Sequence, residues 1–173
     1  MSNGRITPED AGIWSDEHAA AFKPVVEFAH SQSQKIAIQL AHAGRKASCI
    51  APFLDGDGLA GKELGGWPDD VWGPTSTAFH ETYPTPKEVT KAQIKELVQA
   101  FADAAERSVK VGFDVIEIHA AHGYMLSSFL SPTSNTRKDE YGGESFENRT
   151  RLLLEVVKAV RSVIPENMPL FVR

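Results

Sequence analysis

Apolar positions recur along this chain in two alternating patterns: short uninterrupted runs and longer helical repeats. The runs occupy 35–40, 113–118 and 169–173, and each is typical of a short buried strand. Apolar residues spaced three and four apart predict amphipathic helices over about 91–111 and 146–164. This alternation predicts a parallel sheet in sequential order, with 113–118 in the centre and both helices on one side.

Residues that favour helix ends support this division of the chain. Ser15 predicts the start of a further helix, which Pro24 is expected to kink or shorten. Thr90 and Gln93 have the spacing of a capping box at the start of the helix over 91–111. Gly112 then stands where helices favour a left-handed residue. The helix boundaries are therefore predicted from local signals as well as from periodicity.

The segment 42–88 is rich in glycine and proline, and it separates the first strand from the next helix. So long an irregular connection is uncommon unless it is functional or forms a subsidiary hairpin. We expect Trp67, Trp72 and Phe79 to pack a hairpin lid. Further along, 125–130 is expected to form a short helical turn.

Composition narrows the class of protein. The 173 residues suffice for a single domain over 1–173 with its own core, but a closed (β/α)₈ barrel usually needs about 250 residues. A net charge of −5 argues against nucleic acid as a partner. No apolar run is long enough for a membrane span, the N-terminus is polar, and the single cysteine, Cys49, cannot form an internal disulfide. We therefore expect a cytoplasmic protein.

The candidate chemistry lies directly after the strand 113–118, where His119, His122 and Tyr124 follow in six residues. The carboxyl ends of parallel strands are where such proteins place their active sites. Two imidazole N–H donors converging on one carbonyl oxygen would polarise a conjugated enone, and the phenol of Tyr124 would supply a proton. Packing or surface histidines remain the plain alternative.

A metal site is a further interpretation of the two histidines. His42, His80 and Glu117 are candidate third ligands only by their possible proximity, and none is clearly placed. We predict no metal.

Three motifs together resemble the old yellow enzyme family of flavin-dependent ene-reductases. They are the stretch 119–124 (His-Ala-Ala-His-Gly-Tyr), the stretch 134–149 and the stretch 39–45 (Gln-Leu-Ala-His-Ala-Gly-Arg). The resemblance extends from about Gly4 to Arg173. It implies an α/β fold, namely a partial TIM (β/α)₈ barrel containing about strands 3 to 5 with their helices and a long loop or hairpin insertion.

The resemblance also implies a function and the roles of individual residues. It implies an FMN-dependent oxidoreductase that uses NADPH or NADH to reduce the activated C=C bond of a small-molecule enone. His119 and His122 would bind the substrate oxygen, and Tyr124 would protonate the α-carbon. Gln39 would bind the flavin pyrimidine edge, although a polar residue satisfied by backbone groups is its plain alternative. Arg173 would stabilise the anionic reduced ring near N1 and O2.

The charge-dense stretch around Arg137, Asp139 and Glu140 is expected to have a structural role, with Arg137 paired to a carboxylate.

A different function remains open. In this family the FMN phosphate is held by segments after the seventh and eighth strands, and the resemblance places these 173 residues at about strands 3 to 5. The chain would then be a catalytically silent partial barrel that acts as a binding or assembly module. Its open sheet edges would favour a homo-oligomer.

Overall fold

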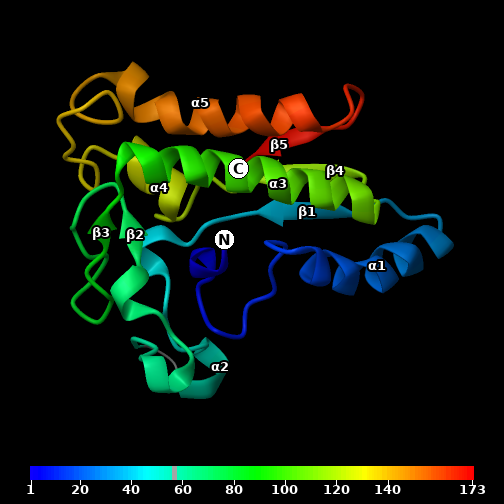
Figure 1. The fold of residues 1–173 in the computed structure, drawn as a ribbon, viewed down its shortest axis with the longest axis horizontal. Helices are drawn as coiled ribbons and strands as arrows, with labels where there is room; N and C mark the ends of the chain where they lie inside the picture. The colour runs from blue at the N-terminus through cyan, green and yellow to red at the C-terminus, as the bar shows by residue number, and fades with distance from the viewer. Residues whose placement is uncertain (56–57) are drawn as a thin grey trace.

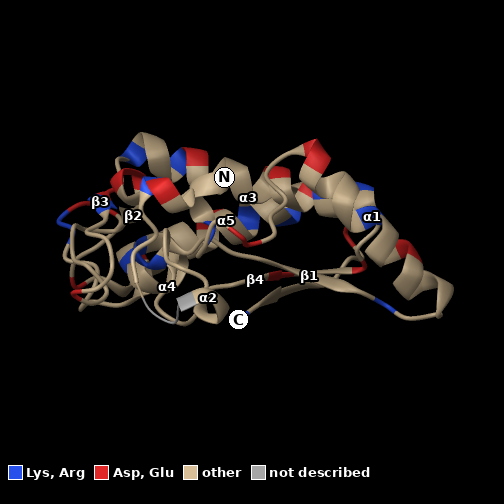
Figure 2. Ribbon diagram, turned by 90° about the horizontal axis from the view of Figure 1, so that it is seen from below, with Lys and Arg blue, Asp and Glu red and all other residues tan. Residues whose placement is uncertain are grey.

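A three-stranded sheet and a layer of helices form the body of the molecule in this computed structural model, which describes residues 1–55 and 58–173 (Figure 1). The strands of the sheet are β1 (Ala37–Leu40), β4 (Val115–Ile118) and β5 (Leu170–Val172). The long helices are α1 (Asp16–Ser31), α3 (Lys91–Val111) and α5 (Phe146–Val163). Figure 2 shows these three helices on the same side of the sheet.

The sheet has the order β1-β4-β5 and all its strands are parallel, so the predicted central position of the second strand is confirmed. The first two strands begin two residues later than predicted. At that end, the carboxylate of Asp114 accepts a hydrogen bond from the backbone N–H of Ile36 at 3.0 Å. The carboxylate of Asp114 therefore takes the place of a backbone acceptor for Ile36. Regular pairing of the two strands starts between Ala37 and Val115.

The two faces of the sheet differ in character. Leu40, Ile116 and Ile118 are buried against the helices. Because side chains alternate along a strand, Gln39 and Glu117, which are paired in register, point to the opposite face. The helices α1, α3 and α5 leave that face uncovered (Figure 2). In a closed barrel this would be the inner face, and ligands would bind at its carboxyl end.

The helices α3 and α5 pack on the sheet and on each other through the apolar stripes that the sequence predicts. The fully or nearly fully buried members of these stripes are Ile94, Leu97, Phe101, Ala105, Leu152, Val156 and Val160. Helix α3 begins at the predicted capping box of Thr90 and Gln93 and ends at Gly112, whose φ is 107°. Both boundary predictions are confirmed.

Helix α1 begins at the predicted cap, where the side chain of Ser15 accepts a hydrogen bond from the backbone N–H of His18. It then continues through Pro24 to Ser31, so the expected shortening is wrong. Proline lacks the N–H that would bond the carbonyl of Ala20. Ala20 and Pro24 both lie on the exposed side of the helix, where water can bond that carbonyl.

The described part of the connection from β1 to α3 contains six short helices and strands. They are η2 (Gly44–Lys46), α2 (Pro52–Asp55), η3 (Lys62–Leu64), η4 (Pro68–Asp70), β2 (Trp72–Gly73) and β3 (Lys87–Glu88). The strands β2 and β3 pair in parallel, so these two strands do not form a hairpin. An antiparallel contact in the connection is the bridge between Cys49 and Leu59. Two further short helices are η1 (Ser2–Gly4) and α4 (Met125–Leu130), and the latter is the predicted helical turn.

The three aromatic residues of this connection do not pack together as one lid, so that expectation is wrong. Trp72 is buried in the main core and stacks on His42, with ring centroids 6.1 Å apart. Trp67 lies beneath the guanidinium of Arg5, and Phe79 lies beneath the ammonium of Lys46. Each ring therefore packs with a different part of the chain.

Arg137 holds the connection to the core and has the structural role predicted for the charged stretch. Its Nη1 donates hydrogen bonds to the carbonyls of Pro74 and Val89 at 3.1 and 2.7 Å. Its other nitrogens pair with the carboxylate of Asp139.

Within the described residues, no helix combines the length and apolar character needed to cross a membrane.

Candidate active site

The carboxyl ends of β1, β4 and β5 meet at one edge of the sheet because the strands are parallel. Gln39, His119 and Arg173 lie there, on the three neighbouring strands or just after them. The backbone of Arg173 is fixed by two hydrogen bonds: its N–H donates to Ile118 and its carbonyl accepts from Ala120. The sheet therefore brings together three of the predicted site residues.

The residues 119–124, which we call the histidine turn, carry the other two. His122 and Gly123 both have left-handed backbones, with φ values of 60° and 71°. This reversal brings the ring of His122 to 5.0 Å from that of His119 and the ring of Tyr124 to 5.1 Å, measured between centroids. Both rings stand nearly perpendicular to the His119 ring. The two imidazoles and the phenol thus form one cluster.

His119 is suited to donate a hydrogen bond as a neutral ring. Its side chain is 6% exposed, and its Nδ1 is buried with no hydrogen-bond partner among the described residues. Burial lowers the pKa of His119, and the charges of His122 and Arg173 lower it further. An unsatisfied buried polar atom costs about 1–3 kcal/mol, so this nitrogen is a natural point of attachment for a ligand.

Tyr124 is suited to keep its proton until it is needed. Burial raises the pKa of its phenol, and the nearby carboxylate of Asp10 raises it further. The phenol therefore remains protonated across the neutral range, as a proton donor must.

The side-chain amide of Gln39, with its NH₂ donor and its carbonyl acceptor, lies at the open face of the sheet. Its Nε2 donates a hydrogen bond to the carboxylate of Glu117, its register partner on β4. The NH₂ group of Gln39 is therefore satisfied by a side chain, and not by backbone groups as in the plain alternative. The carboxylate orients the amide and leaves its carbonyl oxygen available as an acceptor.

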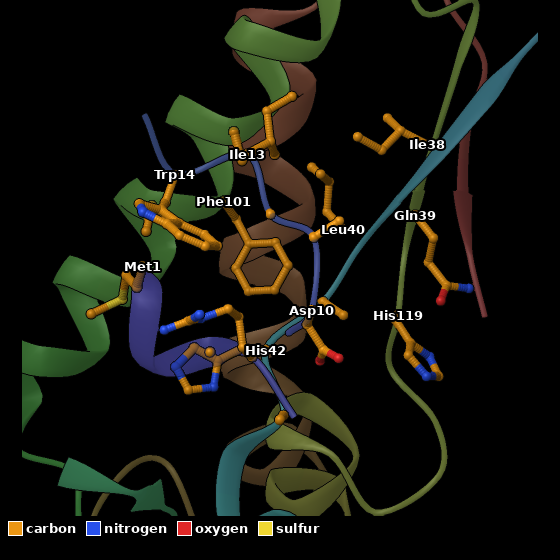
Figure 3. A pocket seen from close by; sticks show the side chains of 18 of the residues that line it. Met1, Asp10, Ile13, Trp14, Ile38, Gln39, Leu40, His42, Phe101 and His119 are labelled. Carbon is orange, nitrogen blue, oxygen red and sulfur yellow. The ribbon is translucent and has the colours of Figure 1, made fainter. Parts of the chain in front are cut away.

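A cavity of about 650 Å³ connects these residues with the space between the sheet and the helices. Figure 3 shows Gln39 and His119 on one side of β1 and Phe101 and Leu40 on the other. His122, Tyr124 and Arg173 also line it. The cavity therefore has a polar part at the cluster and an apolar part beneath helix α3.

Sequence analysis missed Lys46, and it named His42 only as a possible metal ligand. Lys46, directly after the 39–45 motif, donates a hydrogen bond to the carbonyl of His122 at 2.8 Å. His42, inside that motif, is 4% exposed, and its Nε2 has no partner among the described residues. The position of Lys46 next to a conspicuous motif was the only available signal, because its partner lies 76 positions away.

The alternative metal ligands do not gather around the two histidines. Across residues 1–55 and 58–173, no group of three or more His, Cys, Asp or Glu side chains could hold a metal ion. His80 instead contacts the hydroxyl of Thr82, and Glu117 bonds Gln39.

A parallel barrel segment with a polar cluster at its carboxyl edge is the arrangement of a barrel enzyme. Comparison with known proteins identifies the family. The model of the NADH:flavin oxidoreductase / NADH oxidase family matches residues 1–173. The chain belongs to this family, which includes the old yellow enzymes and uses FMN with NADH or NADPH.

Individual relatives support the same assignment. The chain is 55% identical over 174 residues to an NADH:flavin oxidoreductase of Gibberella zeae, and 50% identical over 170 residues to the NADPH dehydrogenase of Bacillus subtilis. Those matches cover 100% and 98% of this chain but only 42% and 44% of the relatives. An old yellow enzyme homologue from Zymomonas mobilis superposes with a TM-score of 0.82 at 27% identity, over 99% of this chain and 47% of that one.

The residues present fit the ring portion of FMN. The amide of Gln39 offers an acceptor at the open face, and Arg173 brings a positive charge to the same edge. The charge of Arg173 reaches the site, since it lowers the pKa of His119. Gln39 and Arg173 would hold the flavin ring beside His119. The chain spans less than half the length of these curated relatives.

Proposed function

We propose that this chain supplies the substrate clamp of an FMN-dependent NAD(P)H oxidoreductase that reduces the activated C=C bond of α,β-unsaturated carbonyl compounds. The observation that carries this proposal is the convergence of His122 and Tyr124 on His119, with each ring centroid about 5 Å from that of His119. The unpartnered buried Nδ1 of His119 and the adjoining cavity support it.

In this proposal the two histidines bind the carbonyl oxygen of the enone. Neutral imidazoles donate hydrogen bonds, and the lowered pKa of His119 favours that form at neutral pH. Hydrogen bonds to the oxygen draw electrons from the conjugated system, so the β-carbon becomes electrophilic and the developing enolate is stabilised. FMN, once reduced by NADPH or NADH, supplies the two electrons and the hydrogen that the β-carbon receives.

Tyr124 completes the reduction in this scheme. Its phenol donates a proton to the α-carbon as the enolate collapses, and solvent later returns that proton. Gln39 and Arg173 would bind the flavin ring on the open face of the sheet and take no part in the proton transfer. The overall change consumes one enone, one NADPH and one proton, and gives the saturated carbonyl compound and NADP⁺.

The test uses the purified chain with excess FMN, NADPH and cyclohex-2-enone. We expect loss of the enone with formation of cyclohexanone, measured by gas chromatography. The variant carrying His119→Ala and His122→Ala should lose this activity while a flavin absorbance titration shows unchanged FMN binding. Absence of turnover at saturating FMN contradicts the proposal, and so does turnover that survives loss of both histidines.

A second candidate function rests on the edges of the sheet. Among the described residues, β1 and β5 each pair only with β4, and Phe171 and Val172 are 56% and 48% exposed. Unpaired strand edges and exposed apolar side chains favour association with further strands. The chain would then act as an assembly module, with another copy as its partner. Size-exclusion chromatography decides this, because a colourless oligomer favours assembly and a yellow monomer favours the enzyme.

The proposed site of action is the cytoplasm. A single cysteine in 173 residues supports a reducing compartment, since it leaves no internal disulfide to form.

A further inference from the structure

The ammonium of Lys46 contacts the histidine turn from outside the cluster. Its Nζ donates a hydrogen bond to the carbonyl of His122 at 2.8 Å. Lys46 is the last residue of η2, which follows β1, whereas the turn follows β4. The hydrogen bond therefore joins the loops of two neighbouring strands at the active edge of the sheet.

The backbone of the turn needs such a contact. His122 has a φ of 60°, and a left-handed backbone is strained for a residue with a β-carbon. The backbone of the neighbouring Gly123 is held by the helix that follows it, α4. The N–H of Gly123 donates a hydrogen bond to the hydroxyl of Ser127, and its carbonyl accepts one from the hydroxyl of Ser128. Within the described part of the chain, the carbonyl of His122 is held by Lys46.

The side chain of Lys46 is itself held in place. Its Nζ lies 3.8 Å from the ring centroid of Phe79 and 5.5 Å from that of Tyr124. Its Cε would come within 3.4 Å of a β-carbon placed on Gly123, so the stem packs directly on the turn. A cation between two aromatic faces has a defined position, unlike an ordinary surface lysine.

We propose that Lys46 is a positioning residue that fixes the histidine turn, and thereby sets where His122 and Tyr124 stand relative to His119. The catalytic consequence rests on the proposed function, but the positioning itself does not. Lys46 makes no contact with the reacting atoms in this proposal. It acts through the carbonyl of His122 and through the ring of Tyr124.

The structural test compares Lys46→Met and Lys46→Arg with the native chain. Methionine keeps an apolar stem but removes the charge and the hydrogen bond, whereas arginine restores a cationic donor. Lys95→Met, on the exposed surface of α3, is the matched control. We expect Lys46→Met to shift the ring NMR signals of His122 and Tyr124. It should also raise amide exchange of Tyr124 by about tenfold, the effect of losing one charge-assisted hydrogen bond.

Rescue separates positioning from general stability. Lys46→Arg should return the ring signals towards those of the native chain, and the urea midpoint of Lys46→Met should stay close to that of Lys95→Met. Ring signals and amide exchange that do not change in Lys46→Met overturn the proposal. A fall in global stability that accounts for the whole increase in exchange overturns it as well.

The catalytic arm uses the same variants with FMN, NADPH and cyclohex-2-enone. A misplaced turn should lower kcat/KM for the enone by about tenfold or more in Lys46→Met and leave flavin reduction by NADPH unchanged. Equal slowing of both half-reactions overturns a role at the turn. If the native chain itself reduces no enone, the proposed function fails, while the NMR comparison still decides the role of Lys46.

Discussion

Arg137 and Asp139 form a two-point ion pair in which the guanidinium Nε and Nη2 donate to the two carboxylate oxygens at 3.0 and 2.6 Å. The remaining nitrogen, Nη1, donates to the carbonyls of Pro74 and Val89. The guanidinium side chain is only 4% exposed. One buried cation therefore fixes the loop after α4 against both ends of the segment that contains β2 and β3.

Loss of this cation should destabilise the fold strongly. Arg137→Met keeps the apolar stem but leaves a carboxylate and two carbonyls without their donor, which should cost about 3–5 kcal/mol of unfolding free energy. Urea unfolding followed by tryptophan fluorescence measures the loss. Lys138→Met, at the exposed neighbouring position, should change stability little. A cost of less than about 1 kcal/mol for Arg137→Met would mean that the network is not coupled to folding.

His42 should make stability depend on pH between 5 and 7, above the usual range of carboxylates. Burial and, to a smaller extent, the charge of the N-terminal amine lower the pKa of His42 from 6.5 to about 3. The unfolded chain takes up this proton near pH 6.5, whereas the folded chain takes it up only near pH 3. The contribution is therefore complete above pH 6.5, and it is lost as the pH falls towards 3.

The measurement compares unfolding free energies at pH 7 and pH 5. The native chain should lose about 2 kcal/mol from this one group over that interval. His42→Gln should lose less, because glutamine does not titrate and its oxygen can still accept from the backbone N–H of Gly44, as Nδ1 of His42 does at 3.0 Å. Parallel pH profiles for the two proteins would show that His42 is not the group responsible.

Local signals explain why much of the fold could be predicted. Thr90, Gln93 and Gly112 define helix α3 through contacts within three or four residues of one another, and these contacts are visible in the sequence. The apolar runs gave the strand order, since short crossovers in parallel folds place consecutive strands side by side. The cluster of His119, His122 and Tyr124 was also predictable, because a single turn carries all three.

The remaining features depend on contacts between distant residues. Lys46 and His122 lie 76 positions apart, and Arg137 reaches Pro74 across 63 positions. The parallel pairing of β2 with β3 involves two residues from each strand, too few for a pattern to predict. Trp72 was assigned to a lid because of its neighbours in sequence, yet its ring is buried beside His42.

Gly44 should not tolerate a side chain, both because its backbone is left-handed and because a neighbouring segment lies too close. Its φ is 61°, and a β-carbon there would lie 2.8 Å from the backbone nitrogen of Met125. That nitrogen donates to the carbonyl of His42 at 3.0 Å, a contact between the loops of two strands. Gly44→Ala should therefore cost more than the roughly 1–2 kcal/mol of a left-handed alanine alone.

Gly65→Ala is the matched control, because Gly65 is also left-handed at a φ of 78° but its nearest neighbour would lie 3.7 Å from the new β-carbon. Urea unfolding should show a larger loss for Gly44→Ala than for Gly65→Ala. Equal losses would indicate that backbone strain alone accounts for both and that the contact with Met125 relaxes freely.

Tyr124→Phe tests the assignment of the proton donor. The phenol is needed only when the enolate is protonated, so flavin reduction by NADPH should continue at the native rate. Reoxidation by cyclohex-2-enone should slow by about 100-fold, a usual effect of losing a general acid. Stopped-flow absorbance of the flavin measures the two half-reactions separately.

The pH dependence provides a second check on the same residue. Because burial raises the pKa of Tyr124, its acid form persists at higher pH than in a free phenol, and the native enone step should hold its rate through pH 9 and decline only above pH 10. Tyr141→Phe is the control, since burial also raises the pKa of that phenol, to about 12, but it bonds Glu155. It should leave both half-reactions unchanged. Equal slowing of flavin reduction and enone reduction in Tyr124→Phe would assign Tyr124 to positioning and remove it as the acid.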